Sequence, residues 1–237
     1  MARQILFAVP FAVLLLIGGE SATFTITNNC PMTIWPAAFS NKESPPSKTG
    51  FELASQASDT IDIPSTAKTS GRIWARTYCT ATCRTGECGH GGGACSGATG
   101  VPPATLAEFT LNDNGGLDTY DISNVDGFNL RVSLAPENQA CFTASCSGDI
   151  NADCPADRAI KVPSGSDTVG CLSDCAALNR PEDCCTGAFS TPGTCQPSKS
   201  AIYFKEKCPQ AYGYAYHDQT STFTCSTGTN YRITFCP

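Results

Sequence analysis

Sixteen cysteines, spread from Cys30 to Cys236, constrain this 237-residue chain more than any other feature of its sequence. The number is even and high, and in an exported protein such a set forms disulfides, here eight with no free thiol. Sequence alone leaves about two million ways to pair sixteen cysteines. One pair is disfavoured, because a bond between the adjacent Cys184 and Cys185 would be strained, so each is expected to reach a different partner.

The N-terminal residues predict export. Arg3 supplies a positive charge before an almost wholly apolar run at residues 5–17, and small residues such as Gly18 follow it. This pattern is typical of a secretory signal peptide, here residues 1–21 with cleavage before Ala22. The run is too short to favour a membrane span. We therefore expect a secreted, extracellular protein, whose mature chain of about 216 residues can bury one sizeable core.

Short segments in which apolar and polar residues alternate, bounded by Gly, Pro and Asn turns, recur along most of the chain. Alternation with a period of two is typical of strands that are buried on one face. Many short strands of this kind predict a mainly β chain that folds as a β-sandwich or flattened barrel. The predicted strands are residues 23–27, 33–35, 60–63, 72–77, 106–111, 119–123, 128–132, 221–224 and 231–236.

Two regions interrupt the strand pattern. Residues 79–95 form a Gly-rich segment with four cysteines, and residues 141–208 hold nine of the sixteen cysteines with little alternation. Within the second region, residues 171–178 have cysteine and leucine side chains at helical spacing, which predicts a short helix that Pro181 ends. We therefore predict a loop-rich lobe that disulfides stabilise because its own core is small.

The carboxylates of one stretch, residues 104–132, are predicted to share the solvent side of a sheet. Alternation in its first strand turns Phe109 toward the core and Glu108 away from it, and Asp121 in the next strand faces the same way as Glu108. Asp126 follows in an Asp-Gly turn. Together these carboxylates outline an acidic cleft mounted on a sheet.

The charge and the rare residues of the chain exclude some functions. Its formal net charge of −6 comes without basic blocks, so nucleic acid is not an expected partner. Two histidines, His90 and His217, are too few for a convincing Ser/His/Asp triad. We expect no cofactor and no metal. Cysteine and histidine are common zinc ligands, and a group of them occurs at Cys79, Cys83, Cys88, His90 and Cys95. In an exported chain, however, we expect these cysteines to form disulfides instead of a zinc site.

These features belong to a wider resemblance that covers residues 22–237. Seven motifs occur in order along the chain: ATFTITNNCP, GRIWARTYC, PPATLAEFTL, DTYDIS, CPQAYGYAY, STFTC and NYRITFCP. By these motifs and its cysteines, the chain resembles the thaumatin-like proteins, the pathogenesis-related group 5 of plants. The resemblance implies a β-sandwich at residues 22–77, 96–140 and 209–237, a small disulfide loop domain at 78–95 and a disulfide-rich lobe at 141–208.

The resemblance also implies how the cysteines pair. It separates the two vicinal cysteines, as the strain argument requires. It joins the first cysteine to the last, a bond worth about 4–5 kcal/mol in the loop-entropy model. The implied bonds are Cys30–Cys236, Cys79–Cys83, Cys88–Cys95, Cys141–Cys225, Cys146–Cys208, Cys154–Cys171, Cys175–Cys184 and Cys185–Cys195.

The family's cleft carries an arginine, a glutamate and three aspartates. By motif, the resemblance assigns the first four of these positions to Arg72, Glu108, Asp121 and Asp126. The fifth position reads His217 in this chain instead of an aspartate. This departure removes one of the expected carboxylates from the cleft.

The residues around position 217 complete the set of candidate binding residues. Asp218 follows directly, but it is not a simple substitute for the missing aspartate, because neighbours on a strand point to opposite faces. Tyr214 and Tyr216 are candidates for stacking on sugar rings, although alternating tyrosines are also ordinary strand composition. We expect His217 to line or border the cleft, with a role as proton carrier near pH 6–7 as the alternative.

The resemblance implies an antifungal plant defence protein of the apoplast, a monomer that binds fungal cell-wall β-1,3-glucan with weak or no endo-β-1,3-glucanase activity. Hydrolysis needs two carboxyl groups, one of which holds a proton. Glu108 is the expected proton donor, because Leu106 and Phe109 can shield it from water. Asp121 and Asp126 are expected to stay ionised, since both lie near turns with exposed backbone amides.

Two other interpretations compete with a glucan cleft. In the first, the carboxylates are solvated turn residues that Arg72 neutralises, and they have no ligand. In the second, the protein is membrane-permeabilising or receptor-engaging and acts through its acidic face, without stable membrane insertion. The net charge of −6 motivates this alternative, which predicts a strong dependence on salt that binding of a neutral glucan would lack.

Overall fold

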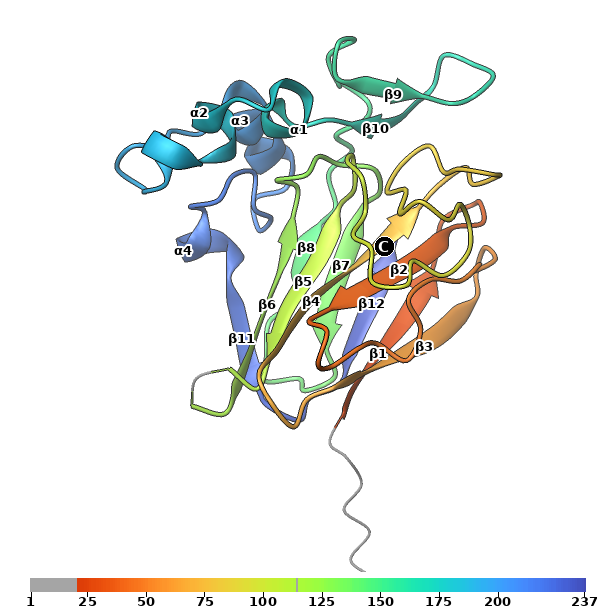
Figure 1. Cartoon of the computed structure of the whole chain (residues 1–237), viewed down its shortest axis with the longest axis vertical. Helices are drawn as coiled ribbons and strands as arrows, with labels where there is room; N and C mark the ends of the chain where they lie inside the picture. The colour runs from red at the N-terminus through yellow and green to blue at the C-terminus, as the bar shows by residue number, and fades with distance from the viewer. Residues whose placement is uncertain (1–20, 114) are drawn as a thin grey trace, which may run out of the picture.

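The computed structural model describes residues 21–113 and 115–237, and two five-stranded β-sheets form its centre (Figure 1). The first sheet has the order β3 (Ser58–Pro64), β1 (Ser21–Asn28), β12 (Tyr231–Phe235), β7 (Val132–Pro136) and β8 (Ala144–Cys146). The second has the order β11 (Phe223–Ser226), β6 (Leu117–Ser123), β5 (Leu106–Leu111), β4 (Thr69–Arg76) and β2 (Trp35–Ser40). Within the described residues the sheets form an open sandwich, which confirms the mainly β prediction and excludes the closed barrel. The predicted signal peptide lies, except for Ser21, outside the described residues.

Most strands of the sandwich lie where alternation predicted them, and β2 shows why one does not. The strand predicted at residues 33–35 instead begins at Trp35 and runs through Pro36. A proline fits here because β2 is an edge strand. The Pro36 carbonyl accepts a hydrogen bond from the Phe51 N–H of a neighbouring loop. The backbone nitrogen of Pro36, which has no hydrogen to donate, lies on the same side of the strand and so does not face β4.

The strand predicted at residues 128–132 is mostly a loop, because only Val132 belongs to β7. The side chain of the buried Asn129 makes the hydrogen bonds that a strand partner would otherwise make. Its amide nitrogen donates to the Ala75 carbonyl and to the Thr85 hydroxyl, each at 2.8 Å, while its oxygen accepts two backbone N–H groups. One asparagine therefore holds this loop against the end of β4.

Aromatic rings from both sheets meet in the centre of the sandwich. The Phe24 ring of β1 lies 4.9 Å from the Phe109 ring of β5 and 5.1 Å from the Tyr231 ring of β12, centroid to centroid. All three side chains are buried, and burial of a side chain of this size stabilises a fold by about 1.5–3 kcal/mol. The Tyr231 hydroxyl also donates to the buried Asp118 carboxylate of β6 at 2.8 Å, so a hydrogen bond joins the sheets as well.

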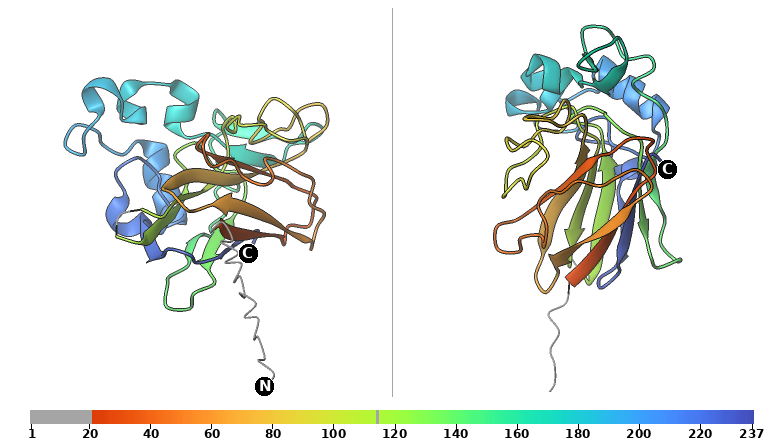
Figure 2. Two further views of the ribbon diagram at one scale, coloured as in Figure 1. Left: turned by 60° about the horizontal axis from the view of Figure 1, so that its bottom comes forward. Right: turned by 90° about the vertical axis from the view of Figure 1, so that its right-hand side faces the viewer.

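A lobe of short elements lies across one end of the sandwich (Figure 1 and Figure 2). Ser173 caps the first helix of this lobe, Asn179 in the left-handed conformation ends it, and Pro181 begins the next helix. The prediction that Pro181 ends the first helix is therefore wrong. The lobe contains β9 (Ala159–Lys161), β10 (Thr168–Cys171), α1 (Asp174–Leu178), α2 (Pro181–Cys184), the 3-10 turn η1 (Gly187–Phe189) and α3 (Lys199–Lys207).

The small loop region at residues 78–95 is built on two buried side chains of β4. The Trp74 indole donates to the Gly86 carbonyl at 2.8 Å, and the Arg76 guanidinium donates to three further loop carbonyls. Within the loop, the Glu87 carboxylate accepts backbone N–H groups from four residues. The Arg76 and Glu87 side chains thus form hydrogen bonds with the backbone carbonyl and N–H groups of the loop. This segment has little apolar core of its own.

All eight disulfides implied by the resemblance are present, and no cysteine of the described chain is free. Four of them lie within residues 141–208, and the vicinal cysteines reach different partners. The cysteines of the loop region are bonded to one another rather than arranged around zinc. Across residues 21–113 and 115–237, none of the helices combines the length and the apolar character that a bilayer crossing requires.

Candidate functional site

A row of paired residues crosses the outer face of the second sheet. Strand register sets Phe39 of β2 opposite Arg72 of β4, Arg72 opposite Glu108 of β5, and Glu108 opposite Asp121 of β6. Residues directly opposite each other in a sheet project from the same face. Ala107, the chain neighbour of Glu108, is fully buried, so the row faces away from the core.

Arg72 links two carboxylates of this face. Its Nη2 lies 3.3 Å from Oε1 of Glu108, and its Nη1 lies 3.6 Å from Oδ2 of Asp126, which reaches over from the turn after β6. The three side chains keep about a third of their surface exposed, so each ion pair contributes only modestly to stability. The structure thus brings together the four residues to which the sequence assigned a cleft, with Asp121 beside Glu108 in the next strand.

These residues line a hollow of about 250 Å³, which we call the Arg72 cleft. Its opposite wall comes from Val125 and from Tyr212, a residue far along the chain. A second hollow of about 280 Å³ lies along the same row and shares Arg72, Glu108 and Asp121 with the first. The two hollows therefore meet at this row and form one groove, in which the first lies on the side of Leu106 and Ser123 and the second on the side of Thr110 and Thr119.

Three carboxyl groups face one cation in the Arg72 cleft, and their pKa values rise. Burial raises the pKa of Glu108 against the opposing effect of Arg72, and the Asp126 carboxylate adds to the rise. Burial, with a further contribution from Glu108, raises the pKa of Asp121 to about 8. Burial also raises the pKa of Asp126, again against the opposing effect of Arg72.

These pKa values confirm one expectation and contradict another. Glu108 has the raised pKa that its apolar neighbours predicted. Asp121, with a pKa of about 8, is mainly protonated at neutral pH and does not stay ionised as predicted. The reason is burial beside Glu108; within the described residues, Oδ1 of Asp121 is buried and accepts no hydrogen bond. Adjacent carboxyl groups cannot easily both ionise, so the pair shares a proton at neutral pH.

Comparison with known proteins identifies the family of this chain. A model of the thaumatin family matches residues 28–237. The chain belongs to the thaumatin family. It is 50% identical over 229 residues to thaumatin-like protein 1 of Pyrus pyrifolia, covering 93% of each chain. It is 46% identical over 222 residues to pathogenesis-related protein 5 of Arabidopsis thaliana, covering 90% of each chain. A Prunus avium protein named glucan endo-1,3-beta-glucosidase is 44% identical over 242 residues, covering 98% of each chain.

In this member of the thaumatin family, His217 does not stand among the described residues that line the Arg72 cleft. Its Nδ1 accepts a hydrogen bond from the Gly213 N–H at 3.1 Å, and its ring lies 4.4 Å from the Tyr214 ring, centroid to centroid. Burial and the nearby Lys205 lower the pKa of His217 to about 4. His217 is therefore neutral at physiological pH, which excludes the alternative of a proton carrier near pH 6–7.

Asp218 acts on the cleft even though strand geometry argued against it. The residue begins the short helix α4 (Asp218–Ser221), so the rule that neighbours on a strand point to opposite faces does not apply. Tyr212, in the cleft wall, donates its hydroxyl to Oδ1 of Asp218 at 2.9 Å. The charge of Asp218 in turn contributes to the raised pKa of Asp121, after burial and Glu108.

Tyr214 and Tyr216 pack with His217 instead of forming a strand. Their rings lie 6.0 Å apart in an edge-on arrangement, and neither lines the Arg72 cleft in the described structure. The segment turns into α4, which also displaces the strand predicted at residues 221–224, so that β11 starts at Phe223.

Two polar residues that line the Arg72 cleft, Ser123 and Tyr212, were not among the candidate site residues. Ser123 forms a side-chain hydrogen bond with Glu108, and its spacing of two from Asp121 correctly indicates the same face of the strand. No local signal separates Tyr212 from Tyr214 and Tyr216, because its position depends on backbone hydrogen bonds to β6 and to the turn that follows.

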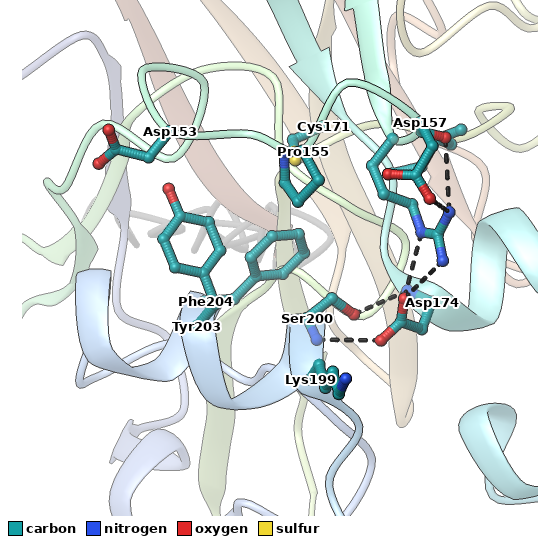
Figure 3. A pocket seen from close by; sticks show the side chains of 11 residues that line it. Asp153, Pro155, Asp157, Cys171, Asp174, Lys199, Ser200, Tyr203 and Phe204 are labelled. Atoms are coloured by element: carbon teal, nitrogen blue, oxygen red, sulfur yellow. Dashed lines mark hydrogen bonds and ion pairs between the residues drawn. The ribbon is translucent and has the colours of Figure 1, made fainter.

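A further hollow, of about 320 Å³, lies in the lobe beside the rings of Tyr203 and Phe204 (Figure 3). We call it the lobe hollow. The Arg158 guanidinium donates two hydrogen bonds to Oδ1 of Asp174 at 3.0 and 3.1 Å, and the Ser200 N–H donates to Oδ2 at 3.0 Å. Burial alone would raise the pKa of Asp174, but these hydrogen bonds outweigh it and hold the pKa below its ordinary value. In the lobe hollow Arg158 and Asp174 thus satisfy each other, whereas the carboxyl groups of the Arg72 cleft do not have such partners in full, so the Arg72 cleft is the candidate site.

Proposed function

We propose that this protein is a secreted, antifungal defence protein of the plant apoplast that binds β-1,3-glucan of fungal cell walls in the Arg72 cleft. The observation that carries the proposal is a half-buried cluster of three carboxyl groups and one guanidinium along a groove in the sheet. The relatives support it: one is named a pathogenesis-related protein and another a glucan endo-1,3-beta-glucosidase. The eight disulfides suit an oxidising, extracellular compartment.

The electrostatics of the cleft favour a neutral, hydroxyl-rich ligand. An anionic ligand would add charge beside three carboxyl groups, whereas a sugar brings none. The protonated Asp121 offers a donor, and the Arg72 guanidinium offers further donors beside it.

Binding with weak or no hydrolysis follows from the same groups. In glycoside hydrolysis one carboxyl group protonates the leaving oxygen while another acts as base or nucleophile. The Glu108–Asp121 pair holds the proton, and Asp126 is the group that would activate water or stabilise the oxocarbenium-like charge. Arg72, however, lies within 3.6 Å of Asp126 and neutralises it, and His217 replaces the fifth carboxylate. We therefore propose that hydrolysis is feeble.

Retention on insoluble β-1,3-glucan tests the binding site. We expect wild-type protein to be retained at low and high salt, and Glu108→Gln with Asp126→Asn to bind about tenfold more weakly, because charge-assisted hydrogen bonds are lost. Glu206→Gln with Asp167→Asn is the matched control, since both carboxylates are exposed and lie outside the cleft. Wild-type protein that washes through the glucan would end the proposal.

A laminarin assay tests the catalytic part. We expect slow hydrolysis by the wild type and none by Glu108→Gln. Brisk hydrolysis that Glu108→Gln leaves unchanged would refute the assigned groups. If hydrolysis appears only in His217→Asp, the histidine at the fifth cleft position is the reason that the wild type does not hydrolyse glucan.

The alternative function, permeabilisation of membranes or engagement of a receptor through the acidic face, rests on the net charge of −6. It requires no glucan and weakens as salt screens the charge. Leakage from fungal spheroplasts stripped of glucan, abolished at high salt, would favour this alternative over a glucan cleft.

A further inference from the structure

The groove across the sheet continues beyond the Arg72 cleft. The second hollow, which shares Arg72, Glu108 and Asp121 with the cleft, reaches Phe39 at the edge strand β2. A third hollow of about 550 Å³ begins at the same Phe39 and extends under the loops that contain Thr49 and Ser96. Phe39 therefore borders both hollows, and the three hollows follow one another along a single path.

The strand register gives this path its direction. Phe39, Arg72, Glu108 and Asp121 stand opposite one another on β2, β4, β5 and β6, so the second hollow runs across the strands. From Asp121 to Phe39 it covers three strand spacings, about 14 Å, before the third hollow begins. A ligand that fills the whole path must therefore be long and linear, and a compact molecule would occupy only one part of it.

The third hollow, which we call the Phe39 hollow, differs in chemistry from the cleft. Phe39, Pro45 and Pro46 provide apolar surface, Thr49 and Ser96 carry hydroxyl groups, and Lys42 contributes an ammonium group. Phe39 is half-buried and packs against the cluster that contains the buried Trp74, which limits its motion. A few polar groups on a mostly apolar wall are typical of small-molecule and sugar sites, because ring faces pack on the apolar part while hydroxyls form hydrogen bonds.

The walls of the Phe39 hollow are held in place by the backbone and by a disulfide. The Ala38 N–H donates to the Thr49 carbonyl at 3.3 Å, which fixes the loop against β2. The Ser96 N–H donates to the Thr49 hydroxyl at 3.1 Å, which joins the two walls. The Cys88–Cys95 disulfide anchors the residue directly before Ser96. The hollow is thus preformed, so little conformational entropy is lost when a ligand enters.

We propose that the Phe39 hollow is an additional subsite for the same linear, uncharged polysaccharide, and that a chain seated in the Arg72 cleft continues over the Phe39 ring into it. This inference rests on the proposed function, because the continuing chain is the β-1,3-glucan of the cleft. The cleft supplies directional hydrogen bonds at the charged end of the groove. The Phe39 hollow supplies apolar contact at the other end and makes affinity depend on the length of the chain.

Amide chemical shifts of the isotope-labelled protein, recorded with β-1,3-linked glucose oligomers, test the inference. We expect a disaccharide to shift the amides of Glu108 and Asp121 alone. An octasaccharide should also shift those of Thr49 and Ser96 and bind at least about tenfold more tightly. If the octasaccharide shifts only the cleft amides, with no gain over a tetrasaccharide, the Phe39 subsite is wrong and the cleft stands. If no oligomer shifts any of these amides, the proposed function itself fails.

Two matched variants of Phe39 separate ring stacking from packing. We expect Phe39→Tyr to keep the affinity for the octasaccharide, and Phe39→Leu, which retains an apolar side chain without a ring, to lose about fivefold to tenfold. The loss in Phe39→Leu should be smaller for the disaccharide, which does not reach the Phe39 hollow. The thermal midpoint of each variant shows whether it is folded. Equal octasaccharide affinity in folded Phe39→Leu and the wild type would overturn the assignment.

Discussion

The Arg72 cleft and the lobe hollow both gather aspartates around an arginine, yet the two regions treat these charges in opposite ways. In the lobe, Asp174 accepts hydrogen bonds from Arg158 and from a backbone N–H, and its pKa falls. In the cleft, Asp121 keeps a buried oxygen that accepts no hydrogen bond within the described residues, and its pKa rises to about 8. Satisfied carboxylates hold the lobe together, whereas the under-satisfied ones in the cleft can gain hydrogen bonds from a ligand.

The two regions also differ in what stabilises them. The sandwich is filled by aromatic and aliphatic side chains from both sheets. In the lobe, α1, α2 and η1 contain no buried residue of their own, and four disulfides lie within residues 141–208. The lobe thus depends on covalent bonds and paired charges, and the sandwich on its core.

Reduction of the disulfides should have the largest effect on stability, because the lobe depends on these bonds. Each bond is worth about 2–4 kcal/mol, so the loss of all of them exceeds the stability of an ordinary domain. We expect fully reduced and alkylated protein to lose its cooperative thermal transition in calorimetry. Phe24→Ala, a core truncation worth about 3–5 kcal/mol, should only lower the midpoint. A reduced protein that still melts cooperatively near the native midpoint would contradict this account.

The pH dependence of stability should have opposite signs in the two regions. Asp121 keeps its proton when folded up to about pH 8, so its contribution to the free energy of unfolding is present below about pH 4 and is lost as pH rises toward 8. Asp174 has a lowered pKa, so its contribution is present at neutral pH and is lost as pH falls below about 4.

A matched pair of substitutions measures these signs. After allowance for solvent screening, Asp121→Asn should stabilise the protein by about 2 kcal/mol at pH 8 and hardly at all at pH 4. Asp174→Asn should cost about 1–2 kcal/mol at pH 7, and this cost should vanish near pH 3. Urea denaturation of disulfide-intact protein over this pH range gives both differences. The same sign for both variants at pH 8 would show that the two regions do not differ as described.

The smallest expected effect concerns the coupling between α4 and the cleft. Asp218→Asn removes a negative charge that helps to raise the pKa of Asp121, so that pKa should fall below about 8, though by less than in Glu108→Gln. Tyr212→Phe should act in the same direction, because it releases Asp218. Carboxyl carbon shifts followed by NMR report the titration, with Asp167→Asn as control. An unchanged titration in Asp218→Asn would show that the residue has no influence on the cleft.

Local spacing was enough to predict much of the fold and part of the site. Alternation placed Glu108 and Asp121 on the solvent face, because the side of a strand to which a residue points depends only on its immediate neighbours. It also located β5 and β12 within a residue of their bounds. The cysteine pairing did not follow from spacing; it came from the resemblance to a family.

The features that escaped prediction depend on residues far apart in the chain. Asn129 replaces a strand by bonding to Ala75, 54 residues earlier. Tyr212 belongs to an alternating run of tyrosines that looks like a strand, but its backbone pairs only with the end of β6 and the turn after it. The pKa of Asp121 depends on Asp218, which no short-range pattern connects to it. Tertiary contacts decided each of these cases.

The position of β1 has a consequence for how the protein is made. This strand is synthesised early, yet it pairs in parallel with β12, and Cys30 is joined to a partner 206 residues later. Until that partner emerges from the ribosome, the first sheet is incomplete and one edge of β1 stays open, a site where other chains can add. Contacts of such long range also slow folding. The newly made chain therefore keeps an open strand edge for almost the whole of its synthesis, although the finished molecule is held together by eight covalent bridges.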